Sequence, residues 1–294
     1  MLKPLKPVAA IVAIAATPGE LAAIAAARAA LSDDEWVSTR TDSELLRYVR
    51  SAGIWGDPLA SRLRATSAFR TDTVPAATDT QWEFGSFFPA HEESFYPATT
   101  GAEGDFMEWL EDEDGIPLLD NEGAALLLVR PYRYKAGAIE PETWLRLVSW
   151  HGERVAVWSR AAAARAAESG SAPTVAPVGC SSFSVLIDWR GAGLRNFDAQ
   201  VLRKLLPSLA RNYPDSLHKA YVVPVNTIFL TVWRVLCLLL PKQISDRFTL
   251  ISGNDMSEQL AAALGPRVAA RLPSCMQVGS KEEAQEEEGV VEWL

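Results

Sequence analysis

The chain has 294 residues, 48% of them hydrophobic and 22% charged, a composition typical of globular proteins and not of disordered ones. Its net charge of −9 excludes the strongly basic surface that nucleic-acid binding requires. The three cysteines, Cys180, Cys237 and Cys275, are odd in number and widely spaced, which predicts free thiols in a reducing compartment and argues against a zinc site.

Residues 1–31 are predicted to be a helical extension or a targeting segment. Within residues 1–16, two lysines precede an apolar run, a pattern typical of signal and transit sequences. From Thr17 to Glu20 the sequence has a capping residue, a proline and a glutamate at the spacing of a helix start. This predicts an alanine-rich helix to about Leu31 and makes the helical extension the favoured alternative.

Residues 32–75 are predicted to form a small helical module. The segments Ser32–Glu35 and Thr41–Glu44 both have the capping-box pattern and predict two helices, the second ending at Gly53. A third helix is expected from Leu59 to Arg70. Residues 76–115 then form a connector rich in aromatic and acidic side chains, which we expect to be irregular but packed against the rest of the protein.

Residues 116–279 are predicted to form an α/β domain. Apolar strands alternate here with helices, which is typical of a mixed, mostly parallel sheet flanked by helices. Residues 280–294 form an acidic tail with six glutamates and one lysine from Lys281 onward. The expected strands are 124–130, 183–188, 220–224 and 247–251, and the expected helices run from 140 to about 168, up to 212, and from 228 to 240.

The helix predicted from Ile228 to Leu240 is apolar on nearly every side, and Arg234 is its one charged residue. A helix on the surface of a globular domain normally keeps a polar face. We therefore expect this helix to bury two faces, one of which meets lipid. It is too short to span a membrane.

A partial glycine motif, Gly191-Ala-Gly193, follows a strand and suggests a nucleotide-dependent enzyme as an alternative. Asn196 stands where the third glycine of a dinucleotide-binding turn belongs. The three histidines have no context that marks a general base. We therefore predict that the protein is not an enzyme and has no catalytic residue, metal or cofactor.

Several short motifs occur in the order found in one known family. They are DSELLRYVR from Asp42, Phe69-Arg70, the strand ending at Asp188, NYPDSLHKAYVVP from Asn212, Phe229 and Trp233 on the apolar helix, and Leu272-Pro273 through Gly279. In this order, over about residues 40–279, the chain resembles the CRAL-TRIO lipid-binding domain.

The resemblance implies a hydrophobic pocket floored by the sheet, with the apolar helix as a gate that opens on a membrane. The implied function is to bind a single lipid and to transfer or present it at membranes. The implied lipid-binding residues are Asp215, Tyr221, Val223, Phe229, Trp233, Leu236, Leu240 and Arg247.

The resemblance is incomplete at the positions that hold an inositol headgroup in some members. Arg247 and Asp215 keep the basic and acidic residues, but Ala52 replaces an arginine and Ile244 a threonine, and Pro224 to Asn226 departs from the usual turn. The ligand is therefore phosphatidylinositol, another phospholipid, or an isoprenoid or sterol.

We expect a monomer in the cytoplasm, transiently bound to membranes, or in an organelle if residues 1–16 are a targeting segment. The alternative function is a non-catalytic adaptor whose pocket is filled by side chains.

Overall fold

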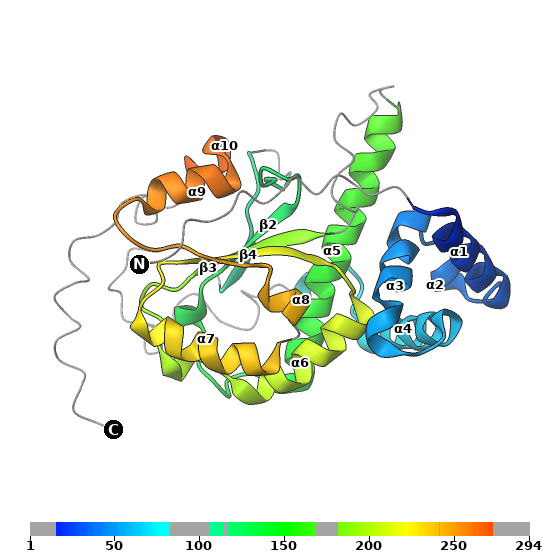
Figure 1. The fold of residues 1–294 in the computed structure, drawn as a ribbon, viewed down its shortest axis with the longest axis horizontal. Coiled ribbons are helices and arrows are strands. Elements are labelled where there is room, and N and C mark those ends of the chain that lie inside the picture. Colours follow the sequence, from blue (N-terminus) through cyan, green and yellow to red (C-terminus); the bar gives the residue numbers. More distant parts are fainter. Residues whose placement is uncertain (1–15, 83–105, 114–116, 169–181, 241, 273–294) are drawn as a thin grey trace.

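The computed structural model describes residues 16–82, 106–113, 117–168, 182–240 and 242–272. Four predicted features lie outside these residues: the targeting segment before residue 16, most of the connector, the motif from Pro273 to Gly279, and the acidic tail. Figure 1 shows a cluster of short helices, α1 to α4, beside a larger α/β part that contains the sheet.

The helical module consists of α1 (Pro18–Ala30), α2 (Glu35–Ser38), α3 (Asp42–Trp55) and α4 (Leu59–Thr73). The predicted capping box at Thr17 is present, with Glu20 N–H donating to Thr17 Oγ1 at 3.2 Å and Thr17 N–H to Glu20 Oε2 at 2.8 Å. Ile24 and Leu31 of the first helical segment share one core with Leu45 and Leu63. The first helix therefore packs with the module.

Two details of the module differ from the expectation. Asp34, and not Ser32, caps α2, because its side chain accepts from Val37 N–H at 3.0 Å. The α3 helix continues through Gly53 to Trp55 and is followed by Gly56, whose φ is +69°. A helix commonly ends at a glycine with positive φ, and Gly56 supplies that backbone conformation here.

The sheet has five strands in the order β1-β2-β3-β4-β5. The edge strand β1 pairs antiparallel with β2, and the other three pairings are parallel. This confirms the predicted fold class of helices followed by a mixed, mostly parallel sheet. The edge strand β1 was not expected, since its residues fall in the predicted irregular connector. The strands are β1 (Met107–Trp109), β2 (Ala125–Val129), β3 (Phe183–Asp188), β4 (Leu217–Val223) and β5 (Phe248–Leu250).

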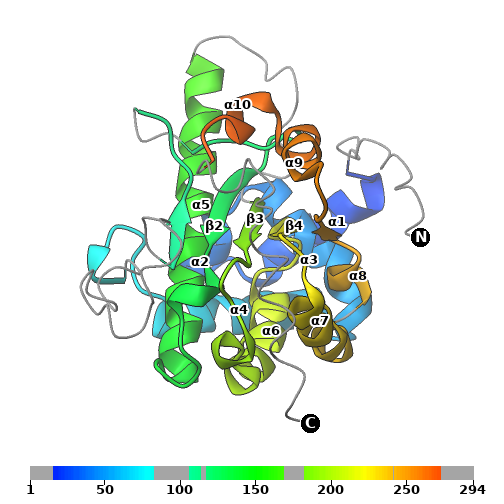
Figure 2. The same cartoon turned by 90° about the vertical axis from the view of Figure 1, so that its left-hand side faces the viewer.

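Helices cover both faces of the sheet (Figures 1 and 2). On one face, Leu127 and Phe183 pack with α5 (Pro141–Glu168) and α6 (Ala199–Asn212), and Val222 packs with α7 (Thr227–Leu239). On the other face, Leu126 and Leu186 pack under α9 (Met256–Leu264) and α10 (Pro266–Ala269). The short α8 (Lys242–Ser245) links α7 to β5.

Only one face of α7 is buried, so the expectation of two buried faces is wrong for the protein alone. Phe229 and Val232 are each 2% exposed, and Trp233 and Leu236 pack beside them at helical spacing. On the opposite face Leu238 is 85% exposed. Ile228, Leu230 and Val235 are between 41% and 43% exposed. An isolated exposed leucine is ordinary, but these four large apolar side chains lie on the outer half of one helix. Together with the exposed Thr231 and Arg234 they form a largely apolar surface in contact with water.

Candidate functional site

An apolar cavity lies between the sheet and the helices on the α6–α7 side. Its volume is about 160 Å³, and it is partly open to solvent. For comparison, a cavity of roughly 150 Å³ lined by Leu, Ile and Phe holds one benzene molecule. The hydrocarbon lining comes from α5, α6, the first residues of β3 and β4, and the segment after α7: Val148, Phe183, Leu206, Leu209, Ala210, Leu217, Leu240 and Ile244.

A charged pair borders the cavity. Arg247 Nη2 lies 2.5 Å from Asp215 Oδ1, and Arg247 Nη1 donates to the carbonyl oxygen of Leu217. The two side chains are 25% and 44% exposed, which places the pair at the solvent end of the cavity. Asp215 has a φ of +55°, a left-handed conformation that aspartate tolerates better than most residues.

The eight predicted site residues fall into three groups. Asp215, Leu240 and Arg247 line the cavity. Phe229, Trp233 and Leu236 lie on the same side of the sheet, where Trp233 packs on Phe248 with ring centroids 4.7 Å apart. Tyr221 and Val223 lie on the opposite face, in the core under α9. The structure therefore brings six of the predicted residues to the gate-helix side and does not bring Tyr221 and Val223 there.

Several cavity residues were missed in the sequence. Leu206, Leu209 and Ala210 on α6 recur at intervals of three and four residues, and this spacing could have identified them as one face of a helix. Nothing in the sequence identified Val148 on α5 or Ser51 on α3 as a cavity residue. Because Ser51 belongs to the helical module, the module contributes directly to the cavity wall.

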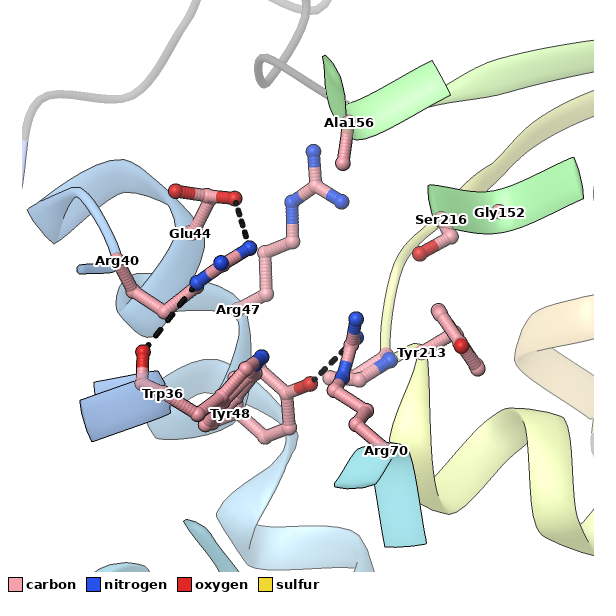
Figure 3. A pocket seen from close by; sticks show the side chains of 11 residues that line it. Trp36, Arg40, Glu44, Arg47, Tyr48, Arg70, Gly152, Ala156, Tyr213 and Ser216 are labelled. Atoms are coloured by element: carbon pink, nitrogen blue, oxygen red, sulfur yellow. Dashed lines mark hydrogen bonds and ion pairs between the residues drawn. The ribbon is translucent and has the colours of Figure 1, made fainter. Parts of the chain in front are cut away.

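A second, smaller pocket of about 30 Å³ adjoins the cavity, where the module meets the α/β part (Figure 3). Arg40, Arg47 and Arg70 line it, and a volume of this size is enough for one water molecule. The guanidinium of Arg70 pairs with Glu153 and lies 4.3 Å from the centroid of the Tyr213 ring. Burial raises the pKa of Tyr213, so this phenol stays neutral. Both pockets share Gly152, Tyr213, Pro214 and Ser216.

The module also holds the C-terminal end of α6. Tyr48 Oη donates to the carbonyl oxygen of Asn212 at 2.6 Å, and Arg70 Nη2 donates to the same oxygen at 3.1 Å. Arg62 Nη2 donates to the carbonyl oxygen of Arg211 at 3.1 Å. The last carbonyls of a helix lack partners within the helix and carry partial negative charge. The module therefore fixes the end of the helix that walls the cavity.

The glycine turn lacks the geometry of a nucleotide site. Gly193 N–H donates to Asn196 Oδ1 at 2.8 Å, so that backbone donor is already engaged. The next α-helix, α6, begins six residues after Gly193. Its N-terminus is capped by the Asp198 carboxylate, which accepts from Gln200 N–H at 3.1 Å and from Val201 N–H at 3.0 Å. A carboxylate in this position occupies the donors that would bind a pyrophosphate and repels it.

The described residues offer neither a metal site nor a membrane-spanning helix. No group of three His, Cys, Asp or Glu side chains there could hold a metal ion. Within the same ranges, no helix is both long and apolar enough to cross a bilayer.

Comparison with known proteins decides the family. The family model of the CRAL/TRIO domain matches residues 115–268, which is more than half of the chain. The chain belongs to the CRAL/TRIO domain family. This confirms the resemblance drawn from the motif order and places the protein in a family of lipid-binding domains. The matched region begins in the segment that leads into β2 and ends within α10, so it contains most of the cavity wall.

No curated protein sequence matches this CRAL/TRIO protein. Among solved structures, the crystal structure of Sfh5 is similar at 12% sequence identity and a TM-score of 0.45, and the match covers 83% of each chain.

Proposed function

We propose that this CRAL/TRIO protein binds a single lipid, or another hydrophobic small molecule, in the cavity beside α7 and transfers or presents it at membranes. The observation that carries the proposal is the two-sided character of α7. Its inner face packs over the sheet beside the cavity, and its outer face presents apolar side chains to water. A helix that only closed a protein core would be expected to have a polar outer face.

The size of the cavity bears on how a ligand enters. A space of about 160 Å³ holds a few carbon atoms of a chain, and not a whole lipid. Entry therefore requires the segment from α7 to β5, which carries Leu240, Ile244 and Arg247, to move away from α6. Since each CH₂ group withdrawn from water contributes about 0.8 kcal/mol, a lipid chain provides a driving force for widening the cavity.

The outer face of α7 is suited to a membrane surface. Fully burying a leucine or isoleucine side chain contributes about 1.5–3 kcal/mol, so the insertion of Ile228, Leu230, Val235 and Leu238 favours docking. This contact would place the moving helix at the source of the ligand. We propose that the protein is a monomer of the cytoplasm that binds membranes transiently and performs no catalysis.

Transfer of a fluorescent lipid between donor and acceptor vesicles tests the proposal. We expect Leu238→Glu to reduce the transfer rate at least tenfold, because it places a charge in the docking surface. Leu119→Glu is the matched control, since Leu119 is 53% exposed and lies beside the start of β2, where it pairs with Ala125. It should transfer lipid at the wild-type rate.

Equal transfer by the two variants would contradict the role of α7. The adaptor alternative predicts a different pair of results: no vesicle-to-vesicle transfer by the wild type, and no co-purifying lipid in native mass spectrometry after incubation with a lipid extract.

A further inference from the structure

The charged residues around the cavity are already paired with each other. Among the described residues that line it, Arg247 and Asp215 are the two that carry a charge. Arg247 also donates to the carbonyl oxygen of Leu217, so its guanidinium has two protein partners. An anionic headgroup at this place would have to displace Asp215 or lie beside its negative charge.

The hydroxyl groups of Ser51 and Tyr213 in the lining are engaged as well. Ser51 Oγ accepts from Arg62 Nη1 at 2.8 Å and donates to the carbonyl oxygen of Tyr48 at 3.2 Å. Tyr213 Oη donates to Glu153 Oε1 at 3.1 Å. At the mouth, Ile244 presents hydrocarbon. A buried polar group without a hydrogen bond costs free energy, so this lining disfavours the burial of a polar or charged headgroup.

The Arg247–Asp215 pair also spans the mouth. Asp215 belongs to the segment between α6 and β4, and Arg247 to the segment between α8 and β5. The cavity wall beside Asp215 includes Pro214 and Leu217 of β4, and the wall beside Arg247 includes Ile244 of α8. The ion pair therefore links the two walls that must separate when a ligand passes.

We propose that the cavity takes the hydrocarbon of an uncharged lipid, and that Arg247 and Asp215 close its mouth by pairing with each other and do not bind a charged headgroup. This inference rests on the proposed carrier function and narrows its ligand class. The pair is partly exposed, and such pairs contribute about 0.2–1 kcal/mol. Its removal is therefore expected to speed the release of a ligand by up to about fivefold.

The test uses the full-length protein and phosphatidylcholine vesicles containing one of four probes: hexadecanol and cholesterol as uncharged lipids, or phosphatidylinositol and phosphatidic acid as anionic lipids. The wild type is expected to transfer the uncharged probes and not the anionic ones. Asp215→Asn keeps a residue that tolerates positive φ while removing the charge. This variant and Arg247→Gln should each speed transfer of the uncharged probes about two- to fivefold.

A double variant and a matched control complete the design. Since both single changes break the same ion pair, Asp215→Asn combined with Arg247→Gln should transfer no faster than either alone. Asp57→Asn removes the Arg211–Asp57 pair, which has a separation of 3.1 Å and side chains that are 45% and 43% exposed. Neither residue lines the cavity, so this control should leave the rate unchanged.

The outcomes distinguish a failure of the inference alone from a failure of the carrier function. Preferential transfer of phosphatidylinositol, lost in Arg247→Gln, would overturn the inference and leave the carrier function standing. Transfer of uncharged probes at wild-type rates by both single variants would overturn the closing role of the pair. Failure of the wild type to transfer any of the four probes would overturn both the inference and the carrier function.

Discussion

The imidazole of His151 makes the stability of this protein depend on pH. His151 lies on α5, is 4% exposed and accepts through Nδ1 from Trp109 Nε1–H at 3.1 Å. Its Nε2 is buried and has no hydrogen-bond partner among the described residues, so a charge on the ring would have no compensating contact there. Burial, reinforced by the nearby Arg154, lowers the pKa of His151 from 6.5 to about 3.

The direction and size of the effect follow from this shift. The folded state keeps His151 neutral while the unfolded chain binds a proton below pH 6.5, so stability falls as the pH drops from 6.5 toward 3. At pH 5 the gap to the unfolded pKa is about 1.5 units, which corresponds to about 2 kcal/mol of lost stability. Any folded-state pKa below about 4 gives nearly the same loss at pH 5.

The assay is urea unfolding at pH 7 and pH 5, with His151→Asn as the comparison. Asparagine offers an oxygen acceptor near the position of Nδ1 and does not titrate in this range. The variant loses stability at both pH values, because it leaves space in the core. Its additional loss between pH 7 and pH 5 should be about 2 kcal/mol smaller than that of the wild type. If the wild type and the variant lost the same free energy of unfolding between pH 7 and pH 5, the pH dependence could not be assigned to His151.

Two further predictions concern the packing of α7 and the joint between the module and α6. Phe229→Ala should lower the free energy of unfolding by about 3–5 kcal/mol, because Phe229 is 2% exposed and packs on Trp189 with ring centroids 5.0 Å apart. Leu230→Ala, at a neighbouring position 42% exposed, should cost no more than about 1 kcal/mol in the same urea titration, and equal losses would contradict the burial of one α7 face. Tyr48→Phe should cost about 1 kcal/mol in thermal or urea unfolding, since the Asn212 carbonyl oxygen keeps its bond from Arg70. A loss above about 3 kcal/mol would show that Arg70 does not replace the missing donor.

The sequence predicted the parallel strands well, because each is a short apolar run bounded by turn residues. It could not predict which face of β4 meets the cavity. Ala220 to Val223 are buried on both faces, and a strand without alternation gives no sign of its orientation. This is why Tyr221 and Val223 were assigned to the site together with Phe229, although they lie on the opposite side of the sheet.

The edge strand β1 was missed for a related reason. Met107–Trp109 has only three residues, and the acidic and aromatic residues around it obscure any alternation. Its pairing with β2 is a long-range contact that local sequence does not encode. The lining of the cavity could not be predicted in detail. A cavity forms where the side chains of several helices and strands together leave space unfilled, and no single element shows this in its sequence.

The two outermost strands of the sheet, β1 and β5, have three residues each. A long, exposed, apolar edge invites another chain to pair with it, and very short edge strands are one of the ways in which proteins avoid aggregation. The longer strands β2, β3 and β4 are interior, and β2 and the second half of β4 are continuously apolar. Under the proposed carrier function, apolar surface is exposed each time a lipid enters or leaves. The short edge strands then protect the protein from polymerising through its sheet, even when α7 and the segment after it are displaced.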